Sequence, residues 1–316
     1  MDTISGLHHV TAICSDAQKN LDFYTQILGL RLVKLTVNFD DPFSYHLYYG
    51  DELGRPGTIL TFFAWSGAKA RAGNQSVAAT ALAVPVGALE WWKTYLAEKS
   101  ISFTLPVTRF GENLLQFHDP DGLVLEIVES PRADTGFVWK NGSIEAKYAI
   151  RGLHSVTIAA EGYEFTANVL TRSLGIKGGA ESPLEPNRFR FESGQGIGGI
   201  VDIVCLPDAP AARGGAGGVH HIAFRVADDG AQTRFRAELV RGNFNVSPIM
   251  DRNYFHSIYF REPGGVLFEL ATDNPGFAID ESAENLGKML KLPTQLEAYR
   301  AQIEERAAKI VLPHQK

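Results

Sequence analysis

Apolar and polar positions near the start of the chain alternate with a period of two and then change to a helical period. Residues 9–14 form a short run with β-branched residues, which predicts a strand. Ser15 and Gln18 have the spacing of a capping box, so we expect a helix to begin there, and Gly29 is placed to end it. The apolar stripe of that helix is Leu21, Tyr24 and Leu28.

Three further strands follow this helix. Residues 31–37, 44–49 and 58–64 are strand-like, and turn residues at 40–42 and 54–57 separate them. The first unit of the chain is therefore predicted to be a βαβββ module.

The module is repeated along the chain. Residues 6–13 and 28–30 recur as 152–159 and 174–176, while residues 117–127 recur as 260–270 with Glu126 matching Glu269. Strand-like runs at 78–84 and 220–226 begin the second and fourth copies, and the fourth continues into a predicted helix over 229–241 and a turn at 262–265. We therefore predict an α+β protein of four modules.

The modules divide the chain into two expected domains and a tail. Residues 1–135 hold the first pair of modules and residues 148–273 the second, with a polar stretch at 131–141 between them. After residue 273 the apolar positions take a helical period, which predicts a helical tail over 280–316 that packs on the strands.

Composition narrows the classes of function. The 316 residues are 45% hydrophobic, and 30 basic residues face 36 acidic ones for a net charge of −6, which argues against nucleic acid and membrane as partners. Cys14 and Cys205 show no metal-binding or disulfide spacing, and no apolar run resembles a signal or a membrane span. We expect a cytoplasmic protein, and a homo-oligomer stays open.

Two pairs of adjacent histidines are the candidate chemistry. Alternate strand residues face one side, so one histidine of each pair can enter a shared cavity. His9 and His221 each precede a β-branched residue in the first strand of a module, and Glu269 lies in the last strand of the fourth. Two imidazoles and one carboxylate form the ligand triad of non-haem Fe(II) oxygenases, and the same ligand set can bind Mn(II). The alternatives are that the two histidines are hydrogen-bonded structural residues of their strands and that Glu269 lies at a sheet edge. The apolar neighbours of Glu269 make its carboxylate costly to bury without a partner.

On these motifs the chain resembles the vicinal oxygen chelate superfamily, and within it the branch of hydroquinone ring-cleaving dioxygenases. The resemblance implies modules paired into half-barrels around a metal, with the first histidine supplied by the first module. Ser155 stands where His9 would repeat in the third module. The supporting stretches are residues 7–11, 32–38, 45–51, 56–63 and 251–252.

The resemblance also implies the residues that surround the substrate oxygen. By matching position these are His8, Thr11, His220, Arg252 and Tyr259. Packing is the alternative for the first three, and a solvated arginine and a core tyrosine are the alternatives for the others. The remaining histidines that we interpret as structural are His46, His118, His154 and His256, and the Trp91, Trp92 and Tyr95 stripe is interpreted as core.

The function implied is an Fe(II) dioxygenase that opens a hydroquinone-type aromatic diol with O2. Its rivals are a catechol extradiol dioxygenase, a glyoxalase-type lyase or isomerase, and a drug-binding protein on the same scaffold. The lyase would want a fourth ligand, but Ala79 and Ser155 occupy the corresponding repeat positions. Glu126 repeats the position of Glu269 without histidine neighbours, so we predict that it is ion-paired or hydrogen-bonded and holds no metal.

Overall fold

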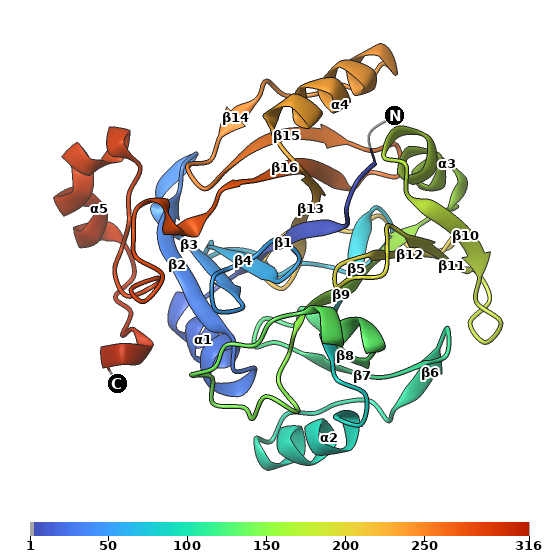
Figure 1. The fold of residues 1–316 in the computed structure, drawn as a ribbon, viewed down its shortest axis with the longest axis horizontal. Coiled ribbons are helices and arrows are strands. Elements are labelled where there is room, and N and C mark those ends of the chain that lie inside the picture. Colours follow the sequence, from blue (N-terminus) through green and yellow to red (C-terminus); the bar gives the residue numbers. More distant parts are fainter. Residues whose placement is uncertain (1–2, 316) are drawn as a thin grey trace.

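The computed structural model describes residues 3–315, and it folds them into two curled sheets of eight strands each (Figure 1). The first sheet has the order β14 (Met250–Asp251), β15 (Phe255–Arg261), β16 (Leu267–Pro275), β13 (Val219–Val226), β1 (Leu7–Cys14), β4 (Ile59–Ala64), β3 (Asp41–Gly50) and β2 (Arg31–Asn38). The second has the order β10 (Lys177–Glu181), β11 (Arg188–Glu192), β12 (Ile200–Cys205), β9 (Gly152–Ala160), β5 (Ser76–Val84), β8 (Val124–Glu129), β7 (Glu112–His118) and β6 (Val107–Arg109).

Each sheet combines one module from each half of the chain. The first strand of every module pairs in parallel with the last strand of the same module, as β1 does with β4 and β13 with β16. The antiparallel pair β1–β13 then joins the first module to the fourth, and β5–β9 joins the second to the third. The predicted α+β half-barrel fold is confirmed. The division into residues 1–135 and 148–273 follows the repeats along the chain and remains a proposal.

Helices pack against the sheets with their apolar sides. The predicted stripe of Leu21, Tyr24 and Leu28 is buried in the main core, as is Trp92, while Trp91 and Tyr95 pack against it. No helix in residues 3–315 is long and apolar enough to span a membrane. The helices are α1 (Ala17–Asp22) with its π-helical continuation η1 (Phe23–Ile27), α2 (Leu89–Glu98), α3 (Glu164–Asn168) with η3 (Val169–Ser173), α4 (Asp229–Arg241), α5 (Arg300–Arg306), and the 3-10 turns η2 (Pro131–Thr135), η4 (Phe277–Ile279), η5 (Thr294–Tyr299) and η6 (Pro313–Gln315).

Two local predictions were wrong in detail. The cap of α1 is Asp16, whose carboxylate accepts from the backbone N–H groups of Gln18 and Lys19, because the Ser15 hydroxyl donates to Asp121 instead. Strand β3 begins at Asp41 rather than at residue 44. The neighbouring strand β4 pairs only with residues 46–49 of β3, so the missing N–H of Pro42 costs no hydrogen bond to β4.

The C-terminal segment is helical only over α5 and short 3-10 turns. It lies beside β2 and β3 in Figure 1, and the N–H of Lys291 donates to the carbonyl of Leu35 on β2. Gly287, at φ 76°, crosses β2 so closely that a Cβ would lie 1.9 Å from the carbonyl oxygen of Leu32. Residues 288–293 of the tail therefore run beside β2 without forming a helix, and Leu290 bridges to Leu35 there, which a helical period alone did not predict. Ile303 is buried on the short helix α5, in keeping with the predicted helical tail.

Candidate metal centre

The three predicted ligands lie in one row of neighbouring strands in the first sheet. His9 on β1 and Glu269 on β16 are both cross-strand neighbours of Ala223 on β13. His221 precedes that alanine by two residues and therefore lies on the same face of β13. Because Ala223 is small, the flanking side chains have room to turn toward one another. The pairing of the first and fourth modules thus brings together residues that are 212 positions apart.

The ligand atoms of this triad converge. Nε2 of His9 lies 3.3 Å from Nε2 of His221, and Oε2 of Glu269 lies 3.3 Å and 2.9 Å from those two nitrogens. All three residues are buried, and within residues 3–315 they are the one group of three such side chains close enough to share a metal ion.

The carboxylate of Glu269 is ionised and incompletely bonded. Burial alone would raise its pKa, but the facing imidazoles of His9 and His221 hold the pKa well below its usual range. Oε1 accepts from the hydroxyl of Ser257, whereas no donor reaches Oε2 with hydrogen-bond geometry despite its short distance to His221. An anionic oxygen without a donor, facing two imidazole nitrogens in a buried site, fits a divalent cation.

Each ligand histidine is held by its neighbour in sequence. Nδ1 of His8 lies 2.9 Å from Nδ1 of His9, and Nδ1 of His220 lies 2.8 Å from Nδ1 of His221. When the ligand donates its Nδ1 proton outward, the lone pair of its Nε2 faces the centre. Burial, together with the ligand histidine beside it, lowers the pKa of His8, and the same causes lower the pKa of His220 to about 4.

The triad lies at a cavity of about 380 Å³ with aromatic walls. His220, Arg252 and Tyr259 line this cavity as expected. Nε of Arg252 lies 3.2 Å from the hydroxyl of Tyr259, and burial raises the pKa of that tyrosine, so it stays protonated. His8 and Thr11 are not among the described residues that line the cavity. The aromatic wall residues are Phe39, Tyr48, Phe63, Trp65, Phe255 and Tyr259.

Thr11 reaches the cavity through a chain of hydrogen bonds. Its Oγ1 accepts from Thr61, whose hydroxyl lies 2.7 Å from Nε2 of His46, and Nδ1 of His46 lies 2.9 Å from the hydroxyl of Tyr48. His46 lines the cavity, although the sequence led us to interpret it as structural. The available signal was strand parity, because His46 and Tyr48 alternate on β3 and therefore share one face.

The other histidines lie elsewhere. His118 is exposed, His154 lies 3.1 Å from Glu112, and Nδ1 of His256 lies 2.6 Å from Asp229. Of the wall residues, sequence reasoning missed Asp40, Phe63 and several other aromatic residues. A contact map, rather than a motif, would be needed to find them.

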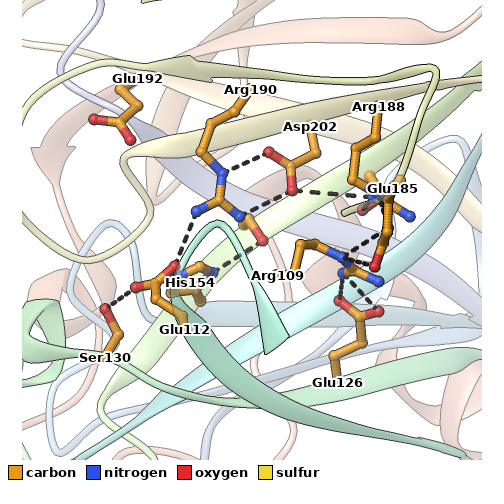
Figure 2. Close-up of polar contacts among 12 residues, drawn as sticks. Arg109, Glu112, Glu126, Ser130, His154, Glu185, Arg188, Arg190, Glu192 and Asp202 are labelled. Carbon is orange, nitrogen blue, oxygen red and sulfur yellow. Dashed lines mark hydrogen bonds and ion pairs between the residues drawn. The ribbon is translucent and has the colours of Figure 1, made fainter. Parts of the chain in front are cut away.

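The second sheet repeats the ligand row without the ligands. Ser155, Ala81 and Glu126 are cross-strand neighbours there, in the places of His9, Ala223 and Glu269. Figure 2 shows that Glu126 is instead bound by Arg109, with N–O distances of 3.0 and 2.9 Å. The predicted ion pairing of Glu126 is therefore confirmed.

This buried ion-pair cluster continues beyond Glu126. Arg109 also binds Glu185, and Arg190 binds both Asp202 and Glu112 (Figure 2). Guanidinium groups thus supply the positive charge on this face of the second sheet. Ala79 and Ser155, the repeat positions where a fourth metal ligand would stand, both lie in this second sheet.

The fold and the triad define a class, namely proteins of paired βαβββ modules with a candidate metal centre in one sheet. The model of the Glyoxalase/Bleomycin resistance protein/Dioxygenase superfamily matches residues 6–127 and 153–270, and the chain belongs to this superfamily.

Similar proteins cover nearly the whole chain. "Putative ring-cleaving dioxygenase MhqO" of Bacillus subtilis (strain 168) is 45% identical, over 95% of each chain. "Chlorohydroquinone/hydroquinone 1,2-dioxygenase" of Sphingobium indicum is 34% identical, over 96% of this chain and 95% of its own. The crystal structure of a "putative dioxygenase" from Bacillus subtilis has 42% identity and a TM-score of 0.93, with 99% of each chain covered.

Proposed function

We propose that this protein is a non-haem Fe(II) dioxygenase that opens the ring of a hydroquinone-type aromatic diol with O2. The observation that carries the proposal is the buried triad of His9, His221 and Glu269 at an aromatic-walled cavity, with one carboxylate oxygen lacking a donor. Three protein ligands leave positions on a metal for both a diol oxygen and O2. The similarity to a chlorohydroquinone/hydroquinone 1,2-dioxygenase supports the substrate class.

His9, His221 and Glu269 would hold the metal, and Mn(II) accepts the same set of ligands. When bound, Fe(II) would supply a common site at which electrons pass from the diol to O2. Both oxygen atoms enter the product as a ring carbon–carbon bond breaks, and the diol itself provides the electrons, so no further reductant is needed.

The residues of the cavity orient the diol and manage its protons. The Tyr259 hydroxyl and the Arg252 guanidinium face the cavity and can donate to a diol oxygen, which favours its anionic form. Burial lowers the pKa of His220 to about 4, so this histidine is neutral near pH 7. Because its Nδ1 accepts from His221, its Nε2–H is left to donate a hydrogen bond to the diol. His8 orients His9 from behind, which makes it a positioning residue.

The proposal is tested by metal content and oxygen uptake. Protein purified anaerobically should hold one iron per chain and consume O2 with hydroquinones, and Glu269→Ala should abolish both. Full iron occupancy in that variant would refute the ligand assignment. Nickel or zinc in place of iron would favour a lyase, and a protein that binds aromatic compounds without metal would favour the drug-binding alternative.

The position of the two hydroxyls on the ring is tested separately. We expect hydroquinones to have a higher kcat/KM than catechols. A catechol with the higher kcat/KM, giving a yellow 2-hydroxymuconic semialdehyde-type product, would assign the protein to the catechol extradiol enzymes.

A further inference from the structure

An ion pair bridges two turns at the cavity. Phe39 and Asp40 form the two-residue turn between β2 and β3, and Arg252 lies in the turn between β14 and β15. Oδ2 of Asp40 lies 3.3 Å from a terminal guanidinium nitrogen of Arg252, and both residues line the cavity. The Asp40 side chain is 70% exposed and that of Arg252 19%, so the carboxylate lies on the solvent side of the pair.

The turn is held in place by its own sequence. The backbone N–H of Asp40 donates to the side-chain oxygen of Asn38 at 3.0 Å, which is an Asx turn. The carboxylate of Asp41 instead accepts from the hydroxyl of Ser44. Of the two adjacent aspartates, Asp40 is thus the one that the structure pairs with Arg252.

Outside the metal centre, the cavity wall carries more negative than positive charge. Arg252 is the one Lys or Arg among the described residues that line the cavity, and its guanidinium already contacts Asp40 and Tyr259. Asp40 and Asp41 add two carboxylates at the β2–β3 turn. An anionic substituent on a substrate would therefore meet like charges and a cation that is already neutralised, whereas apolar substituents would meet aromatic side chains.

We propose that Asp40 is a specificity-determining residue, which selects aromatic diols with uncharged substituents over diols that carry a carboxylate. This proposal rests on the proposed function and adds to it the charge of the accepted substrate. Asp40 acts by neutralising Arg252 and by repelling a second anion at the same place.

The test compares hydroquinone with 2,5-dihydroxybenzoate, which keeps the para-diol and adds one carboxylate. On the iron-loaded enzyme, Asp40→Asn should raise the ratio of kcat/KM for 2,5-dihydroxybenzoate to that for hydroquinone by about fivefold, because the charge of Arg252 becomes available. Asp40→Glu should keep the wild-type ratio. Asp41→Asn removes the same charge from the same turn without freeing Arg252, so its ratio should stay within about twofold of wild type. Added salt should weaken the wild-type discrimination, since the pair is partly exposed.

Three results would overturn the proposal. The first is equal use of both diols by the wild type. The second is an equal effect of Asp40→Asn and Asp41→Asn. The third is a loss of kcat/KM on both diols in Asp40→Asn with their ratio unchanged, which would make Asp40 only a positioning residue for Arg252.

A binding measurement separates this proposal from the proposed function. Trp65 lines the cavity, so quenching of its fluorescence reports the binding of either compound to metal-free protein, with Trp65→Phe as the control for the other tryptophans. If iron-loaded wild type opens no diol, the proposed function fails. The ratio of the two dissociation constants, compared between wild type and Asp40→Asn, would still support or refute the role of Asp40.

Discussion

Glu126 and Glu269 occupy the same position in two repeats, so the same substitution in each provides a matched pair of variants. Glu269→Gln removes the negative charge of the carboxylate from a site where, among residues 3–315, three residues converge. We expect iron content to fall below about a tenth of wild type, because the neutral amide oxygen of glutamine is a weaker ligand for a divalent metal than a carboxylate. Glu126→Gln changes a carboxylate that faces a guanidinium, and we expect iron content and most activity to remain.

The cost of Glu126→Gln follows from its contacts. Arg109 donates to both carboxylate oxygens of Glu126, and it keeps its bonds to Glu185 when that charge is removed. A glutamine can retain one of the two bonds through its carbonyl oxygen. The loss is therefore one charge-assisted hydrogen bond in a buried place, about 2 kcal/mol of unfolding free energy and a few degrees in Tm.

The assay is metal analysis of anaerobically purified protein, with thermal unfolding of the same samples. The pairing of modules would be refuted by two irons per wild-type chain, or by loss of metal in Glu126→Gln. A Glu126→Gln variant with unchanged Tm would contradict the magnitude alone.

Two further predictions concern charges outside the cavity. Lys34→Met should lower the unfolding free energy in urea by about 3–5 kcal/mol, because the buried ammonium of Lys34 is paired with Glu281 of the C-terminal segment. Lys19 is exposed, so Lys19→Met is the control. Equal effects of the two substitutions would refute the reasoning. Despite burial, bonding to His154 and other donors lowers the pKa of Glu112 to about 2 from an ordinary 4.5. The ionised Glu112 therefore contributes up to about 3 kcal/mol of unfolding free energy, which is present above pH 4.5 and is lost as the pH falls toward 2. In urea unfolding, the free energy of Glu112→Gln should fall less than that of wild type across this pH window.

The sequence predicted the modules well because a buried face produces a regular spacing of apolar residues along the chain. Period-two and helical stripes identified the strands and the first helix, and the repeats marked His9, His221 and Glu269 as matched positions. The predictions that failed depended on competition between neighbours. Asp16 caps α1 because Ser15 is bonded to a residue more than a hundred positions away. The predicted helical tail is confirmed by the short helix α5, but Gly287 crosses β2 closely before it, which a helical period does not indicate.

By itself, the sequence determined the four modules, the residues that face inward in each and the loss of ligands from the second and third copies. Only the tertiary structure decided which modules share a sheet, since β1 and β13 meet across more than two hundred residues. The same pairing placed Ala223 between His9 and Glu269, left Oε2 of Glu269 without a donor, and brought Asp40 to Arg252. The physical reason is that side-chain periodicity encodes which face of a strand is buried, whereas the partner on that face is set by cross-strand packing between distant segments.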